Sequence, residues 1–536
     1  MATKLDDTTE ERAVIEIKKL GDVFKTVGLP PYTYVKPSYY GEVRADIEQP
    51  GKHLLIEGPS GVGKTCVVFK VFESINWAKD RDFTYCSCRD ADADSTIARF
   101  FSCCSRGERP SPPLIVIDDF HLLSAARRAE VGSLLKRLSD RTFEQPNPAK
   151  AILIGIPTAG NSLVGESYDL GPRLGSYRVP RATDHEIERL IDEGEHALNV
   201  LFEDRDILLA EGAGNFWLAQ YICNKVCAIQ EIYETQADTK IVTFDLLGIR
   251  QRLMAELSQR YMPIARTFAK GKKWRPGGNK PYLEVLLALA RIPDSVVTFD
   301  KVLNVVAERR KPGLKAIRSR IAEVIHDASK STDLRRQIAF EQDAGFSIED
   351  PLFRYFLTNI DAAQLYKELG VEPESIERSK AYSYDIGFSF AGETRAIVET
   401  VNTQLKSEDV VTFYDFDQQA VLLALDLEGT LRRLYSDSCR YYLVFLGKDY
   451  SEKVWTKFEK DIMHSHRKDH IIPVVLDEAG LTGLAGIPST IGRIDLRAAW
   501  TEISVKGSVS PEAINVIRNR CVMPLLEKLD SLANEL

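Results

Sequence analysis

A chain of 536 residues is too long for a single hydrophobic core, and ordinary domain sizes predict about three or four domains. Apolar residues make up 44% of the chain and charged residues 28%, which is typical of a globular protein. The formal net charge of -8 excludes a basic surface over the whole molecule, so any nucleic-acid site has to be local.

The N-terminus and the cysteines indicate where the chain works. The first residues, "MATKLDDTTEERAV", are acidic, and nowhere does an apolar run reach about 18 residues. We therefore expect no secretion signal and no membrane partner. Nine cysteines, an odd number, fit a reducing compartment better than a disulfide framework, which predicts a cytoplasmic location. Zinc is the weaker alternative for the cysteine cluster, because its spacing departs from paired Cys-x-x-Cys arms. The cluster comprises Cys86, Cys88, Cys103 and Cys104.

The stretch "GKHLLIEGPSGVGKTCVVFKVFESI" combines an apolar run, a glycine-rich turn and an amphipathic helix pattern. The turn matches G-x-x-x-x-G-K-[ST], in which glycines let backbone N–H groups close around phosphate oxygens. Lys64 is expected to neutralise the β- and γ-phosphates of ATP, and Thr65 to hold Mg²⁺. The glycines of this predicted P-loop are Gly58, Gly61 and Gly63.

The run "SPPLIVIDDFHLL" predicts a buried parallel strand that ends in two carboxylates. Paired Asp residues are also a simple turn signal, but the P-loop about fifty residues earlier favours a nucleotide role. In that role Asp118 would organise Mg²⁺ through water, and Asp119 would orient the water that attacks ATP.

A third predicted strand, "KAILIGIPT", ends at Thr158, and three arginines follow before the next helix. This order resembles the AAA+ ATPases and the related STAND signalling NTPases. The resemblance implies an arginine that contacts the γ-phosphate. We take Arg173 as that residue, and Arg178 and Arg181 stay open as alternatives. For each of the three, an exposed loop arginine without a role in ATP binding is the other interpretation.

Periodicity predicts helices from Asp184 to Gln259, which resemble the lid of these ATPases. STAND proteins often carry Gly-x-Pro in this region, where this chain has Gly214, Asn215 and Phe216.

After "KGKKWRPGGNK" the pattern predicts several helices and then two short β runs, which resembles the winged-helix domain of STAND and origin-type NTPases. Winged helices can bind DNA, and these helices carry a local group of basic residues. A basic helix is usually a solvated face, and in STAND proteins the domain packs on the nucleotide as a switch, so DNA is the weaker alternative. The basic residues are Arg309, Arg310, Lys311, Lys315, Arg318 and Arg320.

The last part of the chain alternates strand and helix patterns. Five strand candidates, "YSYDIGFSFAGE", "DVVTFYDF", "CRYYLVFLGK", "HIIPVVLD" and "IGRIDLR", predict a parallel flavodoxin-like sheet. Functional residues are expected at the carboxyl ends of such strands.

These residues resemble the TIR domain, especially its bacterial form, from Tyr384 to about Arg497. "YDIGFSFAGE" is similar to the opening box of the family, "FYDFDQQAVLLALDL" to the second strand and BB loop, and "SEKVWTKFE" to its Ser…Trp-x-x-x-Glu helix. The resemblance implies that Glu459 is the catalytic glutamate of an NAD⁺-cleaving enzyme. The residues implied to bind NAD⁺ are Phe390, Trp455 and Asp415.

The helix pattern around Glu459 also suggests a special role for this residue. Residues three and four positions away share its helix face, and these are Trp455, Thr456, Ile462 and Met463, none of which is a cation. Cleavage of NAD⁺ releases neutral nicotinamide, so the main task is to stabilise an oxocarbenium-like ribose, which one carboxylate can do. A structural glutamate in a non-catalytic TIR scaffold is the alternative.

The predicted fold is therefore α/β and multidomain: an AAA+/STAND P-loop NTPase with a helical lid and a winged helix, then a five-stranded TIR domain. The resemblance implies an ATP-switched homo-oligomer, joined through its NTPase and TIR domains, that depletes NAD⁺ in antiphage defence after an unknown phage or cellular trigger. A winged-helix DNA-handling ATPase is the other alternative. The predicted segments are 1–183 for the NTPase core, 184–275 for the lid, 276–365 for the winged helix, 366–383 for a linker and 384–536 for the TIR domain with a C-terminal helix.

Overall fold

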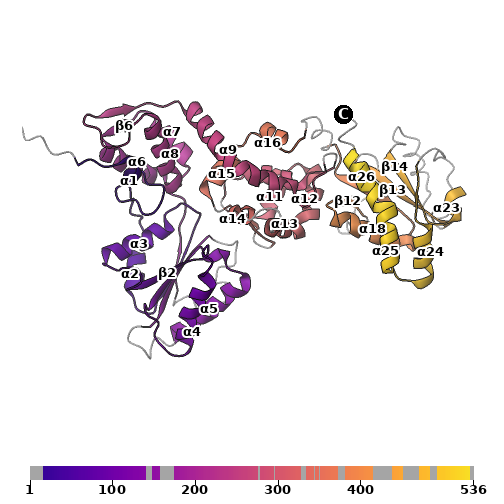
Figure 1. Cartoon of the computed structure of the whole chain (residues 1–536), viewed down its shortest axis with the longest axis horizontal. Coiled ribbons are helices and arrows are strands. Elements are labelled where there is room, and N and C mark those ends of the chain that lie inside the picture. Colours follow the sequence, from indigo (N-terminus) through magenta and orange to yellow (C-terminus); the bar gives the residue numbers. More distant parts are fainter. Residues whose placement is uncertain are drawn as a thin grey trace, which may run out of the picture. The chain divides into compact units, whose positions relative to one another are not determined.

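The fold was analysed in a computed structural model of the chain, shown in Figure 1. The chain divides into two compact units, Met1–Leu257 with Ser347–Tyr355, and Ser258–Phe346 with Phe356–Leu536. None of the described helices is both long enough and apolar enough to cross a bilayer. The structure describes residues 16–140, 148–156, 174–275, 278–294, 296–327, 333–342, 345–348, 350–371, 381–414, 438–448, 450, 470–482 and 492–531.

The first unit is built on a five-stranded sheet in which all strands are parallel, with the order β2-β3-β4-β1-β5. Its central strands are almost continuous apolar runs, as expected for strands covered on both faces. The predicted strands around Leu54, Ile117 and Leu153 are confirmed as β1, β3 and β4. The strands are β1 (His53–Glu57), β2 (Phe83–Ser87), β3 (Leu114–Asp118), β4 (Lys150–Gly155) and β5 (Leu174–Arg178).

Helices cover both faces of this sheet. One apolar core joins the sheet to α2 (Tyr40–Glu48) and α3 (Lys64–Ser74), and a second joins it to α4 (Ala93–Ser105) and α5 (Ala125–Asp140). The short helix η1 (Phe120–Leu122) follows β3 directly. The thiols of Cys86 and Cys104 are buried in the second core. Within the described residues, no group of three or more His, Cys, Asp or Glu side chains is placed to hold a metal ion.

A mainly helical part follows the sheet, as the periodicity predicts. Its first long helix begins with a reciprocal capping box, in which the Thr183 hydroxyl and the Glu186 carboxylate each accept from the other's backbone N–H. A small parallel pair of strands, β6 and β7, was not predicted because each strand has only three residues. The elements are α6 (Asp184–Leu198), β6 (Val200–Phe202), α7 (Arg205–Gly212), α8 (Phe216–Ile229), β7 (Lys240–Val242) and α9 (Leu246–Lys270). The short helix α1 (Leu20–Val23), which precedes the sheet in the chain, contacts α6 and α8.

The chain from residue 281 to 368 forms short helices and a three-stranded sheet with the order β8-β10-β9. The assignment of this part to the winged-helix family stays a prediction. The helices are α10 (Pro281–Arg291), α11 (Phe299–Val305), η3 (Glu308–Arg310), α12 (Lys311–Ile317), η4 (Arg318–Arg320), α13 (Ile321–His326), α14 (Leu334–Gln337), α15 (Pro351–Thr358) and α16 (Ala362–Glu368). The strands are β8 (Val296–Val297), β9 (Ile338–Glu341) and β10 (Gly345–Ile348).

The second unit ends in a five-stranded sheet, again all parallel, with the order β12-β11-β13-β14-β15. Numbered within this domain the order is 2-1-3-4-5, so the predicted flavodoxin-like sheet is confirmed. The strands are β11 (Tyr384–Ser389), β12 (Thr412–Phe413), β13 (Cys439–Leu446), β14 (Ile471–Val475) and β15 (Ile494–Asp495). The described helices are η5 (Gly392–Thr394), α18 (Arg395–Ser407), α23 (Glu478–Thr482), α24 (Arg497–Lys506), α25 (Pro511–Ile517), η8 (Arg518–Val522) and α26 (Met523–Ser531).

Charged side chains connect the helical part of the second unit to the amino-terminal edge of this sheet. Arg275, 8% exposed, donates a hydrogen bond to the backbone carbonyl of Glu408 at 3.2 Å. Arg320 forms an ion pair of 2.8 Å with Asp409, whose side chain is buried. Asp385, at the start of β11, accepts the backbone N–H of residue 279 at 2.9 Å. We call these contacts the amino-edge network.

Candidate functional site

The predicted P-loop lies between β1 and α3, as the motif requires. Gly61 and Gly63 both have positive φ, at 79° and 90°, where a side chain would be strained. A Cβ atom on Gly58 would lie 2.4 Å from the carbonyl oxygen of Val179, so a larger residue does not fit there. Lys64 begins α3, and its Nζ donates to the carbonyls of Gly58 and Pro59 at 2.8 and 2.6 Å. The loop therefore has the shape and the cation for binding phosphate.

The two predicted magnesium ligands are side by side. The Thr65 hydroxyl donates to Oδ2 of Asp118 at 2.9 Å, and the Tyr85 hydroxyl donates to the same oxygen at 2.9 Å. Burial and the adjacent Asp119 carboxylate raise the pKa of Asp118, while the hydrogen bonds from Tyr85 and Thr65 oppose this effect. A divalent cation would offset the cost of burying the carboxylate. A hydroxyl and a carboxylate oxygen form a donor set that suits Mg²⁺.

Asp119 follows β3 in the left-handed backbone conformation, with φ of 55°. Its carboxylate accepts two hydrogen bonds from the Arg89 guanidinium, at 2.7 and 3.2 Å. The expected role of Asp119, orienting a water, stays a prediction. The arginine contact fixes where the carboxylate lies in this state.

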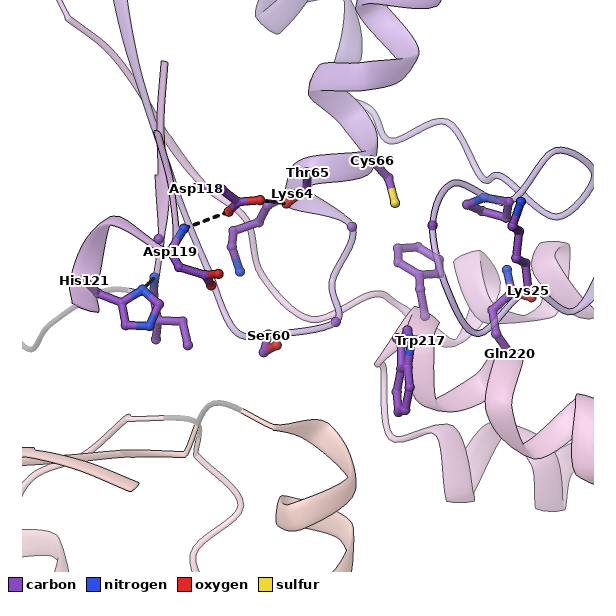
Figure 2. A pocket seen from close by; sticks show the side chains of 17 residues that line it. Lys25, Ser60, Lys64, Thr65, Cys66, Asp118, Asp119, His121, Trp217 and Gln220 are labelled. Carbon is purple, nitrogen blue, oxygen red and sulfur yellow. Dashed lines mark hydrogen bonds between the residues drawn. The ribbon is translucent and has the colours of Figure 1, made fainter. Parts of the chain in front are cut away.

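These residues share one cavity, with a volume of about 220 Å³. Figure 2 shows Asp119 and His121 at one end, Lys64 and Thr65 in the middle, and Lys25 and Gln220 at the other end. The sequence motifs predicted only the P-loop and the two carboxylates at this site. The lining residues that it missed are Lys25, Gly28, Pro30, Ser60, Cys66, His121, Gly155, Ile156, Phe216, Trp217 and Gln220.

The helical part that we predict to be the lid contacts the P-loop through the residues that stand in place of Gly-x-Pro. Asn215 caps α8 by accepting the N–H of Leu218 at 2.9 Å, and its Nδ2 donates to the carbonyl of Ser60 at 2.8 Å. A Cβ on Gly61 would lie 2.4 Å from Oδ1 of Asn215, so the glycine permits this close approach. The backbone N–H of Trp217 also donates to the carbonyl of Gly61, at 3.2 Å. The asparagine thus joins the lid to the phosphate-binding loop.

The predicted arginine sensor cannot be assigned from the described residues. Arg173 and Thr158 lie outside them. Arg178 lies at the end of β5, and Arg181 donates to the carbonyl of Ala213 at 3.3 Å. Both are exposed, and neither lines the cavity as far as the structure describes it.

Most of the basic residues noted in the sequence form contacts with other residues of the second unit. Arg310 is 8% exposed and lies 3.4 Å from the Glu284 carboxylate. Arg320 pairs with Asp409, and the Arg318 guanidinium lies 5.0 Å from the ring centre of Phe299. Lys311 forms an ion pair with Glu308. Only Arg309 and Lys315 of the six are classed as exposed, so these residues do not form one open basic face.

In the second unit, aromatic side chains gather where β11 and β12 end. The rings of Phe390 and Tyr414 stack with centroids 5.7 Å apart and an interplanar angle of 20°. The Arg395 guanidinium lies 5.5 Å from the centre of the Phe390 ring. The Tyr414 hydroxyl donates to Glu399 at 3.1 Å, and burial together with that carboxylate raises the pKa of Tyr414 to about 12. Phe390 is half-buried, so its ring contributes to a flat apolar wall at the carboxyl edge of the sheet.

Neighbouring strand ends add polar groups to this edge. The hydroxyls of Ser389 and Tyr450 lie 2.7 Å apart, and Asp477 after β14 accepts the N–H of Lys448 at 2.8 Å. The predicted catalytic residue and two of the predicted NAD⁺ contacts lie outside the described residues. These are Glu459, Trp455 and Asp415.

Two regions of the chain match known families. Residues 54–163 match the model of the ATPase family associated with various cellular activities (AAA), and residues 386–505 match that of the TIR domain. The chain thus contains an AAA ATPase domain followed by a TIR domain.

Among characterised proteins, the TIR region is similar to the 3' cyclic ADP-D-ribose synthase AaTIR of Aquimarina amphilecti, with 36% identity over 123 residues. The match covers 22% of this chain and 37% of that relative.

Two solved structures from Aeropyrum pernix also align with the chain. The Aeropyrum pernix ORC1 protein in complex with DNA aligns with a TM-score of 0.34 and 15% identity, over 68% of this chain and 98% of that one. The Aeropyrum pernix ORC2 protein aligns with a TM-score of 0.32 and 11% identity, over 66% and 98%.

Proposed function

We propose that this protein is a nucleotide-switched enzyme whose TIR domain cleaves NAD⁺ and releases nicotinamide. The observation that carries the proposal is the 36% identity of the TIR region to a cyclic ADP-ribose synthase, in a chain that also has a built P-loop site. The product is free or cyclised ADP-ribose, and both begin with loss of nicotinamide.

The chemistry requires one carboxylate beside the ribose and an apolar surface for the rings of NAD⁺. Nicotinamide leaves as a neutral molecule, so the transition state carries positive charge on the ribose rather than on the leaving group. Glu459 would stabilise that charge. The half-buried ring of Phe390, which stacks on the buried ring of Tyr414, lies at the carboxyl edge of the sheet, where parallel α/β sheets bind their ligands, and it supplies the apolar surface.

The ATPase domain would control when this reaction occurs. ATP binding offers the Lys64 ammonium a phosphate in place of the two loop carbonyls that it contacts in this structure. Thr65 and Asp118 would hold Mg²⁺, which would supply positive charge to offset that of the phosphates. We propose that the ATP-bound state favours a homo-oligomer in which TIR domains contact one another. A cellular or phage trigger would start this assembly in antiphage defence. NAD⁺ depletion is the output in this proposal.

The test is to incubate the purified chain with NAD⁺, with and without ATP and Mg²⁺, and to follow nicotinamide release by chromatography. Glu459→Gln should lower the rate at least about a hundredfold, the usual scale for losing an electrostatic contact to a transition state. Glu512→Gln, the same change at an exposed position of α25, is the matched control and should leave the rate unchanged. Lys64→Ala should abolish the increase in rate that ATP causes and leave the rate without ATP unchanged.

Three outcomes would redirect the proposal. Nicotinamide release by Glu459→Gln at near the parent rate would remove the catalytic assignment. No NAD⁺ cleavage by the parent protein, with ATP-dependent assembly intact, would favour a TIR scaffold. ATPase activity that rises on addition of DNA would favour the DNA-handling alternative. The ion pairs of Arg310 and Arg320 with internal carboxylates argue against that alternative.

A further inference from the structure

The Asp118 carboxylate is held by hydrogen bonds from three directions, and one donor is a tyrosine outside the nucleotide cavity. Its Oδ2 accepts the hydroxyls of Thr65 and Tyr85, each at 2.9 Å, and its Oδ1 accepts the backbone N–H of Asp119 at 2.9 Å. Figure 2 shows the contacts with Thr65 and Asp119. The described residues that line the cavity include Thr65, Asp118 and Asp119 but not Tyr85. An effect of the Tyr85 hydroxyl on a bound ligand would therefore pass through Asp118.

The local structure fixes the position of the Tyr85 ring. Tyr85 lies on β2, which pairs in parallel with β3, and the register places Ser87 beside Asp118 at the end of β3. The Tyr85 ring packs edge-on against Phe69 of α3, with centroids 5.4 Å apart and an interplanar angle of 61°. Phe69 follows Thr65 by four residues, so the two side chains share one face of α3. That face thus supports the tyrosine ring with Phe69 and reaches the carboxylate with the Thr65 hydroxyl.

The direction of these hydrogen bonds follows from the groups that make them. An ionised carboxylate only accepts, so Thr65 and Tyr85 each donate their single hydroxyl proton to Oδ2 of Asp118. The Thr65 oxygen keeps its lone pairs, and oxygen lone pairs are what Mg²⁺ takes from its ligands. Asp118 therefore has to stay where it receives the Thr65 proton. A second hydroxyl donor on the same oxygen restricts the rotation of the carboxylate away from that position.

We propose that Tyr85 is a positioning residue for the Mg²⁺ site, which acts by holding Asp118 against the Thr65 hydroxyl. This inference rests on the Mg²⁺-binding part of the proposed function. Hydrogen-bond partners of metal-binding side chains orient those side chains, and their loss typically lowers metal affinity by about ten- to a hundredfold. Removal of the Tyr85 hydroxyl should therefore weaken Mg²⁺-dependent binding of the nucleotide and leave Mg²⁺-independent binding intact.

The test measures the affinity of the full-length chain for a non-hydrolysable ATP analogue by calorimetric titration, once with Mg²⁺ and once with EDTA. The ratio of the two dissociation constants is the gain in affinity that Mg²⁺ provides. Tyr85→Phe removes the hydroxyl and keeps the ring on Phe69, so it should lower this gain about tenfold, with the affinity in EDTA within about twofold of the parent. Tyr177→Phe, which removes a hydroxyl that donates to the Asp46 carboxylate at 2.7 Å, is the matched control and should keep the gain.

A double variant tests whether Tyr85 acts through Asp118. Asp118→Ala should itself lower the gain from Mg²⁺, and adding Tyr85→Phe should then change the gain less than about twofold, because the acceptor is absent. A further tenfold loss in the double variant would overturn the inference. The same holds for a gain in Tyr85→Phe within about twofold of the parent, and for an equal loss of affinity with and without Mg²⁺, which would mark a purely structural role. A parent whose affinity does not respond to Mg²⁺ would instead overturn the Mg²⁺ site of Thr65 and Asp118 on which the inference rests.

Discussion

The buried histidine at the start of β1 should make the stability of the ATPase domain depend on pH. His53 is fully buried, and its Nδ1 accepts the backbone N–H of Ala151 at 3.1 Å. Burial and the nearby Lys150 ammonium lower the pKa of His53 from 6.5 to about 4. The folded chain therefore holds a neutral imidazole throughout the range in which the unfolded chain takes up a proton.

The sign and the size follow from the two pKa values. Because the folded pKa is the lower one, stability is at its full value above about pH 6.5 and is lost as pH falls toward 4. The gap between the two values is about 2.5, and each unit corresponds to about 1.36 kcal/mol. The histidine alone should thus remove at most about 3 kcal/mol from the free energy of unfolding on going from pH 7 to pH 4.

Replacement of His53 by asparagine isolates this effect, since the amide oxygen can still accept the N–H of Ala151 but does not titrate. Hydrogen exchange of peptides from β1 and β4, compared between variant and parent at each pH, gives the difference in opening free energy. The opening free energy of His53→Asn, relative to that of the parent, should rise by about 3 kcal/mol on going from pH 7 to pH 4. His185→Asn, at an exposed position, should show no such shift. Parallel curves for His53→Asn and the parent would refute the reasoning.

Two further substitutions test the nucleotide site and the amino-edge network. Asp119→Asn should slow ATP hydrolysis about a hundredfold with ATP affinity within about twofold, because the amide is a poorer acceptor for the attacking water. Phosphate release near the parent rate would contradict that role. Arg320→Ala removes the ion-pair partner of the buried Asp409 carboxylate and should lower the free energy of unfolding by about 3 kcal/mol. The double variant with Asp409→Asn should lose less than the sum of the losses in the two single variants. Hydrogen exchange of peptides covering residues 405–411 measures these costs, and strict additivity would show that the pair is not coupled.

The parts of the fold that follow a local pattern were predictable from the sequence. The continuous apolar runs of the two parallel sheets identify buried strands, and the glycines of the P-loop stand between a strand and a helix pattern as the motif requires. The strands β6 and β7, of three residues each, carry no comparable signal. Short strands of this kind depend on tertiary pairing for their stability.

The far end of the nucleotide cavity was not predictable for a different reason. Lys25 and Gln220 are separated by almost two hundred residues in the sequence, and no spacing relates one to the other. The basic residues around Arg310 and Arg320 show the same limit, because their carboxylate partners Glu284 and Asp409 are supplied by tertiary structure. A charge pattern on one helix indicates which side chains need partners, but it does not indicate where the partners lie.

The positions of the two functional edges of the TIR sheet bear on how the domain can be regulated. Asp385 is the second residue of β11 and belongs to the amino-edge network, whereas Ser389 ends the same strand beside the aromatic wall of Phe390. Along the strand, Asp385 and Ser389 lie about 13 Å apart, because each residue adds about 3.3 Å. The described contacts of the network thus hold the TIR domain without covering the edge where substrate is proposed to bind. Under the proposed function, regulation through this connection would act by moving the TIR domain as a body toward another copy, since a contact at the amino edge cannot block a site at the carboxyl edge.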